Sequence, residues 1–193
     1  MIITIDGPAA VGKSTVARAV ASNLGVPYVD TGAMYRELTA VALERGTAID
    51  DGVALAALVG DRPTAGTDIR AERISQVVSA VSGHPEVRRR MRERQRELAG
   101  SAAVLEGRDT GTRVCPDADL KIYLTAPVAV RAARRAPQLG LPAADVEQAI
   151  EERDRLDARQ MPPAPDAHLI DTGSMDASQV VETVLALARE RTA

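Results

Sequence analysis

Apolar residues near the start of the chain gather in a short run and then change to a longer spacing. Residues 2–5 are Ile-Ile-Thr-Ile and lead into Asp6, Gly7 and Pro8. A short apolar, β-branched run that ends in such residues is typical of a buried parallel strand followed by a loop. From Lys13 onward the apolar spacing is helical. The pattern therefore predicts a strand, a glycine-containing loop and a helix.

The same alternation continues to the end of the chain. Short apolar runs predict four further strands, at residues 26–29, 102–105, 120–124 and 167–170. Helical spacing predicts helices at residues 13–23, 33–45, 50–59, 69–82, 85–99, 128–135, 144–159 and 177–191. Alternating strands and helices favour an α/β fold with a five-stranded parallel sheet flanked by helices. Ligands of such sheets bind at the carboxyl ends of the strands.

The loop after the first strand carries a phosphate-binding pattern. The segment from Gly7 to Ser14 fits G-x-x-x-x-G-K-[ST], and it lies between a predicted strand and a predicted helix, as a P-loop requires. We expect Lys13 to reach the β and γ phosphates of ATP and the Ser14 hydroxyl to contact Mg²⁺. The residues predicted to hold the nucleotide are Gly7, Pro8, Ala9, Ala10, Val11, Gly12, Lys13, Ser14 and Thr15.

Composition and charge narrow the possible partners. The chain has 193 residues, a formal net charge of −3 and no Phe or Trp, so its core must be built from Ala, Val, Leu and Ile. This charge does not favour binding to nucleic acid or to an anionic membrane. Only two of the 24 basic residues, Lys13 and Lys121, are lysines. The abundant arginines suit bidentate phosphate contacts, although a general composition bias explains most of them equally well.

The cysteine content and the hydropathy of the chain indicate where in the cell the protein is found. Cys115 is the only cysteine, so an intramolecular disulfide is impossible, and the start of the chain does not resemble a signal peptide. No apolar run approaches the 18 residues of a membrane-spanning helix. We expect a cytoplasmic protein without nucleic-acid or membrane partners.

Several further stretches resemble bacterial cytidylate kinases. Asp30-Thr31-Gly32-Ala33-Met34-Tyr35-Arg36 follows the P-loop as it does in that family, and Glu106-Gly107-Arg108-Asp109 with Gly111-Thr112 is a second specific match. Weaker matches occur in family order at Ile69-Arg70, Pro85 to Arg88, Gln95-Arg96, Pro116 to Ile122, Arg131 with Arg134-Arg135, and Asp166 to Asp171. The resemblance covers nearly the whole chain and implies an ATP-dependent, Mg²⁺-requiring kinase that phosphorylates CMP and dCMP. It also implies that the protein acts as a monomer and that its partners are small-molecule substrates.

The resemblance also implies roles for individual residues. It implies that the monophosphate is bound by Thr31, Arg36, Arg70, Arg108, Asp109, Arg153 and Arg159. It implies a lid that carries Arg131, Arg134 and Arg135, with Lys13, Arg131, Arg135 and Asp109 serving catalysis. These roles fit the chemistry, because arginines around two phosphates stabilise the charge of the transferring group. By spacing alone, Asp109 fits a structural ion pair equally well, and the lid arginines fit a solvated helix face.

Two departures from the family pattern concern substrate recognition. The family carries a small stranded insert in the monophosphate region, and residues 58–68 are too few to form it. The lid is also abbreviated at residues 138–143, and Arg153 and Arg159 are one residue closer than the family's two functional arginines. We expect flexible segments at residues 137–142 and 161–165.

The pattern predicts one kinase domain with three regions. We expect a core of about residues 1–45, 101–130 and 166–193, a monophosphate-binding region of about residues 46–100, and a lid of about residues 131–165. Two other functions stay open. One is a P-loop kinase for a different small acceptor, such as UMP or a modified nucleotide. The other is a nucleotide switch or nucleic-acid-associated ATPase that uses the arginine-rich residues 88–96, although the net acidity and the few aromatic residues disfavour it.

Overall fold

The computed structural model describes residues 1–158 and 162–191 of the chain. These residues form two compact units, one of Met1–Val29 with Ala99–Ala193 and one of Asp30–Leu98. The first unit contains the phosphate-binding loop and most of the sheet. The region boundaries expected from the sequence remain a prediction, since compactness alone does not define a lid or a substrate region.

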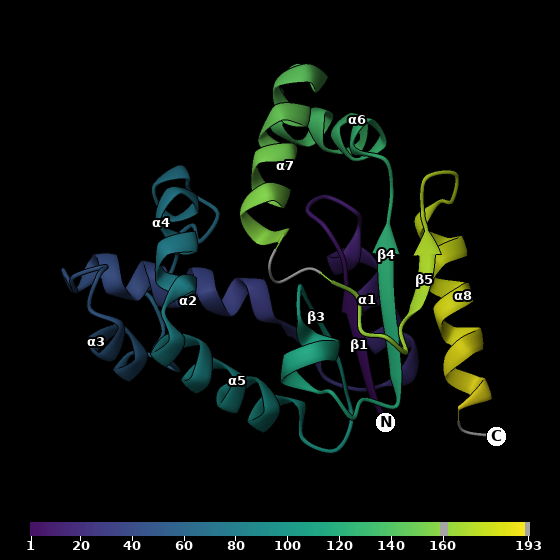
Figure 1. The fold of residues 1–193 in the computed structure, drawn as a ribbon, viewed down its shortest axis with the longest axis horizontal. Helices are drawn as coiled ribbons and strands as arrows, with labels where there is room; N and C mark the ends of the chain where they lie inside the picture. The colour runs from purple at the N-terminus through teal and green to yellow at the C-terminus, as the bar shows by residue number, and fades with distance from the viewer. Residues whose placement is uncertain (159–161, 192–193) are drawn as a thin grey trace. The chain divides into compact units, whose positions relative to one another are not determined.

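A five-stranded parallel sheet forms the centre of the first unit, as the alternating pattern predicts. Its strands are β1 (Ile2–Asp6), β2 (Tyr28–Asp30), β3 (Ala103–Gly107), β4 (Leu120–Thr125) and β5 (His168–Asp171). They lie in the order β2-β3-β1-β4-β5 (Figure 1). Strand β1 is central and pairs in parallel with both β3 and β4. The carboxyl end of β1, where the glycine loop begins, is therefore flanked by the ends of its two neighbours.

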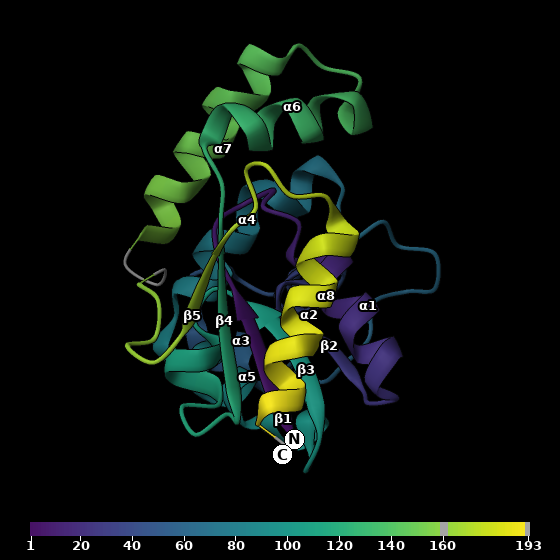
Figure 2. The ribbon, with the colours of Figure 1, turned by 90° about the vertical axis from the view of Figure 1, so that its right-hand side faces the viewer.

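Two helices cover one face of this sheet. Helix α1 (Lys13–Leu24) follows the loop, and α8 (Ala177–Glu190) packs beside it in front of the strands (Figure 2). The buried side chains of the core between these helices and the sheet are aliphatic and include Ile3, Ile5, Val20 and Val184. Burial of these side chains, at roughly 25 cal/mol per Å² of apolar surface, holds β1 and α1 in place at the two ends of the loop.

A helical hairpin, α6 (Val128–Leu139) and α7 (Ala143–Asp157), lies beyond the carboxyl ends of the strands (Figure 1). Ala132, Ala136, Val146 and Ile150 form a small core between the two helices, and Ala9 and Ala10 of the phosphate-binding loop pack against it. The hairpin is thus in direct contact with the loop.

Helix α6 ends later than the sequence predicts. We expected it to end at residue 135 and a flexible segment to begin at Pro137, but Pro137 lies inside the helix, which continues to Leu139. A proline removes one backbone N–H from the helix. The hydrophobic cluster that α6 shares with α7, which includes Ala136, opposes that loss. Gly140, with φ 65°, ends the helix by donating its N–H to the Ala136 carbonyl.

The second unit is a group of helices. It contains α2 (Thr31–Glu44), α3 (Gly52–Ala57), α4 (Glu72–Gly83) and most of α5 (Pro85–Ala99) around a core that includes Leu38, Leu55, Val81 and Met91. Several predicted boundaries were wrong. Helix α2 begins at Thr31 rather than at residue 33, and α3 ends at Ala57 rather than at residue 59. Helix α3 starts later than residue 50 because Asp51 caps it by accepting the Ala54 N–H, and residues 69–71 form a turn before α4.

Residues 58–71, where the family carries its stranded insert, contain turns and no strand in the part of the chain that the structure describes. Among the described residues, none of the helices is both long and apolar enough to cross a membrane.

Candidate functional site

The loop between β1 and α1 has backbone angles that few residues tolerate. Gly7, Ala10 and Gly12 have φ values of 149°, 58° and 99°. A Cβ atom on Gly7 would lie 2.4 Å from the carbonyl oxygen of Leu124, so only glycine fits against β4 at this point. Left-handed residues within such a loop turn successive N–H groups toward one side, which creates a concave anion-binding site at a helix N-terminus.

Lys13 is buried at the base of this loop. Its Nζ donates hydrogen bonds to the carbonyl oxygens of Gly7, at 3.0 Å, and Pro8, at 2.7 Å. Burial lowers the pKa of Lys13 well below its usual value, and the nearby Arg108 guanidinium lowers it further. An anion bound beside Lys13 and Arg108 would offset both of these effects.

The remaining loop residues lead directly into α1. Val11 is buried, Gly12 caps the helix, and Val16 donates its N–H to the Gly12 carbonyl oxygen at 3.1 Å. Ser14 is half-buried and Thr15 is exposed, both in the first turn of α1. Both hydroxyl groups therefore lie at the helix end that carries the partial positive charge of the dipole.

Asp6 links the loop to the segment that follows β3. Its carboxylate accepts hydrogen bonds from the Thr110 N–H at 3.0 Å, the Thr110 hydroxyl at 2.8 Å and the Gly111 N–H at 2.8 Å. Burial raises the pKa of Asp6, and the bonds from Gly111 and Thr110 oppose that rise. These residues open a single turn of π-helix, η1 (Thr110–Val114), which sequence analysis did not predict. Asp6 thereby fixes the position of Arg108, just before this turn.

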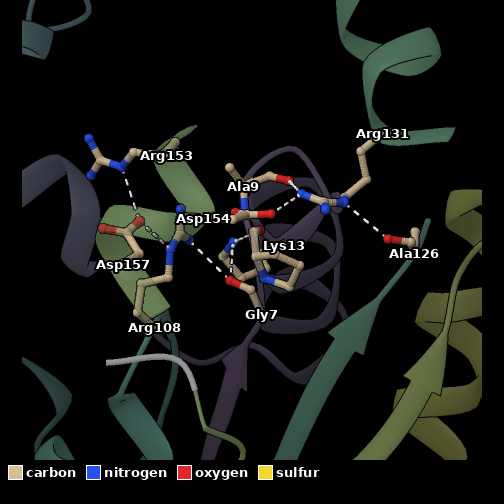
Figure 3. Close-up of polar contacts among 10 residues, drawn as sticks. Gly7, Ala9, Lys13, Arg108, Ala126, Arg131, Arg153, Asp154 and Asp157 are labelled. Carbon is tan, nitrogen blue, oxygen red and sulfur yellow. Dashed lines mark hydrogen bonds and ion pairs between the residues drawn. The ribbon is translucent and has the colours of Figure 1, made fainter. Parts of the chain in front are cut away.

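Arg108 connects the loop to α7. Its Nη1 donates to the Gly7 carbonyl oxygen at 3.2 Å, and its Nε donates to Asp157 Oδ2 at 3.1 Å. Arg153 Nε donates to the same carboxylate oxygen at 3.0 Å. Figure 3 shows both arginines meeting at Asp157 beside the loop. Two of the residues predicted to bind the monophosphate thus converge on one carboxylate.

Asp109 is half-buried next to Arg108. One of its carboxylate oxygens lies 3.8 Å from Arg113 Nε, one turn further along. This contact is an ion pair of the kind that the spacing alone allowed. A pair at this distance with a largely exposed arginine is weak.

Arg131 reaches from α6 onto the loop. It is almost completely buried, and its Nε donates to the Ala126 carbonyl oxygen at 3.0 Å. Its Nη1 donates to the Ala9 carbonyl oxygen at 2.9 Å and to Asp154 Oδ2 at 2.6 Å. The other oxygen of Asp154 accepts the Ala9 N–H at 3.0 Å (Figure 3). Arg131 and Asp154 are therefore both held against the same loop residue.

The other two arginines predicted for the lid point elsewhere. Arg134 donates to the carbonyl oxygens of Thr172, at 2.6 Å, and Met175, at 3.1 Å, in the segment after β5. Arg135 donates to Gln138 Oε1 at 2.6 Å on its own helix. Of the three arginines, the structure places Arg131 at the phosphate-binding loop.

Three predicted residues belong to the second unit. Thr31 is the buried first residue of α2. Arg36 Nη2 lies 3.6 Å from Oδ2 of Asp30, the residue that caps this helix. Arg70 is exposed in the turn before α4. Arg159 lies outside the described residues.

Sequence analysis missed three carboxylates near the loop. Glu106 is buried at the end of β3 and accepts a hydrogen bond from the Tyr28 hydroxyl. The sequence feature that could have revealed Glu106 is its position as an acidic residue directly after a predicted buried strand. The sequence indicates Asp154 and Asp157 more weakly, since they lie one and four residues after Arg153 on the same predicted helix.

Comparison with known proteins identifies the relatives of this chain. The sequence model of the family described as cytidylate kinase matches residues 3–190. A cytidylate kinase of Streptomyces avermitilis is 44% identical, over 100% of this chain and 94% of its own length. A cytidylate kinase of Shouchella clausii is 46% identical, over 97% of this chain and 96% of its own length. In a Synechococcus bifunctional pantoate ligase/cytidylate kinase, 42% identical over 98% of this chain, the match spans 40% of the relative.

The alignment with the Streptomyces avermitilis protein runs over 218 positions and takes in this whole 193-residue chain. About 25 positions of the relative therefore have no counterpart in this chain.

Solved structures agree on the fold. A shikimate kinase from Acinetobacter baumannii, solved in complex with shikimate, is 18% identical with a TM-score of 0.53, over 98% of this chain and 93% of its own. The Thermus thermophilus protein TT1252 is 24% identical with a TM-score of 0.54, over 97% of both chains. At these identities the likeness shows the fold alone. The match to the family model and the curated relatives together show that this chain is an enzyme, a phosphotransferase, and belongs to the cytidylate kinase family.

Proposed function

We propose that this protein transfers the γ-phosphate of ATP to CMP or dCMP and so produces CDP or dCDP. One observation carries the proposal. The phosphate-binding loop is flanked by Lys13, Arg108 and Arg131, three cations that lie on or touch its first residues, in a chain whose relatives are cytidylate kinases over nearly their full length.

The loop would hold the triphosphate of ATP. Its N–H groups bind phosphate oxygens, and Lys13 exchanges its bonds with the Gly7 and Pro8 carbonyls for bonds to the β and γ phosphates. Since an anion beside Lys13 reverses the effect of burial on its pKa, ATP binding favours the charged form of this lysine.

A magnesium ion would be held beside the loop by Ser14, which lies in the first turn of α1. Its hydroxyl suits the ion, because hard cations such as Mg²⁺ prefer oxygen ligands. Within residues 1–158 and 162–191, no three His, Cys, Asp or Glu side chains form a metal-binding group. Mg²⁺ is commonly held by one or two protein groups together with phosphate oxygens and water. When bound, the ion neutralises charge on the β and γ phosphates.

The acceptor phosphate would approach beside Arg108 and Arg153. Both guanidinium groups already bind an anionic group, the Asp157 carboxylate, within the reach of the loop. Phosphoryl transfer brings two negatively charged groups into line, so catalysis depends on cations that offset their repulsion and on correct placement. Arg131, held over Ala9, would stabilise charge on the transferring group.

Substitution of the acceptor-side residues tests this assignment. We expect Arg108→Ala and Asp109→Ala to raise KM for CMP by about tenfold or more and KM for ATP much less, because a lost charge-assisted hydrogen bond is worth roughly 1.5–3 kcal/mol. Steady-state kinetics with each substrate varied in turn measures both constants. An equal effect on the two KM values would place these residues elsewhere.

The absence of a stranded insert should weaken discrimination between bases. Polar groups that recognise a base also penalise a wrong base, because they remain unpaired when it binds. Residues 58–71 form only turns, so fewer such groups are available there. We expect the ratio of kcat/KM for CMP over UMP to be smaller than in an insert-bearing relative, such as the Streptomyces avermitilis enzyme, assayed in parallel. An equal ratio would show that base selectivity comes from other residues.

Two broader alternatives are tested with the wild-type protein. A panel of CMP, dCMP, UMP, AMP and non-nucleotide acceptors separates a cytidylate kinase from a kinase for another acceptor.

We further propose that the protein works in the cytoplasm as a monomer and without nucleic acid. Light scattering measures its mass in solution, and ATP hydrolysis stimulated by RNA or DNA would favour the nucleotide-switch alternative.

A further inference from the structure

Asp154 on α7 makes two contacts with the phosphate-binding machinery. Its Oδ1 accepts the Ala9 N–H at 3.0 Å, and its Oδ2 accepts Arg131 Nη1 at 2.6 Å. The side chain of Asp154 is 18% exposed and that of Arg131 is 7% exposed, so the pair is largely shielded from water. Figure 3 shows Asp154 lying over the loop between Ala9 and Arg131.

These two partners are the ones that a phosphate oxygen would take. P-loops bind phosphate through backbone N–H groups, and arginine binds carboxylate and phosphate with the same planar geometry. The carboxylate of Asp154 therefore takes the place of an anionic ligand in the conformation described here.

The position of Lys13 indicates which phosphate is concerned. P-loop lysines reach the β and γ phosphates. Lys13 Nζ contacts the carbonyls of Gly7 and Pro8, the two residues that precede Ala9. The stretch from Gly7 to Ala9 would thus border the terminal phosphates of ATP.

A carboxylate and a phosphate cannot share this position. Two like charges a few ångströms apart in a site shielded from water repel strongly, and the Ala9 N–H supplies one proton. We propose, on the basis of the proposed function, that Asp154 competes with the terminal phosphate of ATP for the Ala9 N–H and Arg131, and so sets the affinity for ATP. ATP binds once Asp154 has left.

Competition of this kind lowers the apparent affinity by the fraction of molecules in which the site is open to the ligand. Replacing Asp154 removes the competitor and leaves the Arg131 guanidinium without its carboxylate partner. A shielded cation that has lost its partner is unfavourable, so it binds an anionic ligand more readily. The same reasoning predicts that the variant gains more thermal stability from ATP than the wild-type protein does.

The test compares ATP binding to the wild-type protein, Asp154→Asn and Asp154→Ala by isothermal titration calorimetry. Asp154→Asn keeps the size of the side chain, so it still tests the proposal if the alanine variant does not fold. Glu152→Gln is the matched control, since it removes an exposed negative charge from the same helix, where Glu152 pairs with Arg155. ATP, ADP and AMP are titrated in EDTA and again with Mg²⁺.

We expect both Asp154 variants to bind ATP about tenfold more tightly in EDTA. We expect a smaller gain for ADP and none for AMP, and unchanged binding to Glu152→Gln. Equal or weaker ATP binding by folded Asp154 variants would overturn the proposal, as would an equal gain for AMP. An effect seen only with Mg²⁺ would also overturn it, because it would make Asp154 a partner of the metal.

CMP phosphorylation by the wild-type protein is measured alongside. If CMP is not phosphorylated but the Asp154 variants still gain ATP affinity, the proposed function fails and the competition stands. If CMP is phosphorylated and the affinity does not rise, the competition fails by itself.

Discussion

Lys13→Ala is expected to lower kcat for phosphoryl transfer about a hundred- to a thousandfold, the usual effect of removing one positioned group that stabilises transition-state charge. The lysine is placed for this role, because its Nζ lies 3.0 Å from the Gly7 carbonyl oxygen and 2.7 Å from that of Pro8, at the base of the loop. A coupled assay of ADP formation with ATP and CMP measures the loss.

The same substitution should leave the fold intact. Burial lowers the pKa of Lys13, which means that folding disfavours its charged form when no anion is bound. The two hydrogen bonds that alanine loses contribute only about 1 kcal/mol each. Thermal unfolding of Lys13→Ala should therefore occur close to the wild-type temperature, and a folded variant with unchanged turnover would refute the P-loop assignment.

Arg131→Ala is the second large expected effect. We expect kcat to fall about a thousandfold, within the range known for arginines that stabilise phosphoryl transfer, and KM for CMP to change little. The structure supports this role because Arg131 is buried, contacts Ala9 and Ala126, and reaches the loop from α6.

Arg131→Lys is the matched variant. It keeps the charge but replaces a planar group with a point charge, which cannot hold the Ala9 and Ala126 carbonyls together. We expect partial activity. Because Arg131→Ala also leaves Asp154 without its partner, the double variant Arg131→Ala with Asp154→Ala is measured too. Recovery of wild-type kcat in the double variant would show that Arg131 serves only to neutralise Asp154.

Much of the fold was predictable because the strands are short, apolar and separated by helical spacing. All five strands begin and end within two residues of their predicted ranges. The end of α6 was not predictable from Pro137, since the burial of Ala136 against α7 decides it. The π-turn η1 was hidden as well, because it depends on the hydrogen bonds that Asp6 makes across the sheet.

The candidate site divides in the same way. The phosphate-binding loop from Gly7 to Thr15 could be predicted from the local sequence, because the glycines, the lysine and the hydroxyl groups that form it are close together in the chain. The contact between Ala9 and Asp154 joins residues 145 positions apart and depends on how α7 packs on the loop. Helical spacing also placed Arg131, Arg134 and Arg135 on one face, but Arg134 turns to the carbonyls after β5 and Arg135 to Gln138. The spacing of the arginines determines the helix face on which they lie, whereas tertiary contacts determine the hydrogen-bond partner of each one.

The most direct test of the proposed function follows the γ-phosphate itself. The protein is incubated with Mg²⁺, CMP and ATP labelled at the γ position, and the labelled products are separated by chromatography. We predict labelled CDP in equal amount to the ADP formed, and no labelled CDP with Lys13→Ala. Label that appears only as inorganic phosphate, at a rate independent of CMP, would contradict the assignment of this protein as an ATP:CMP phosphotransferase.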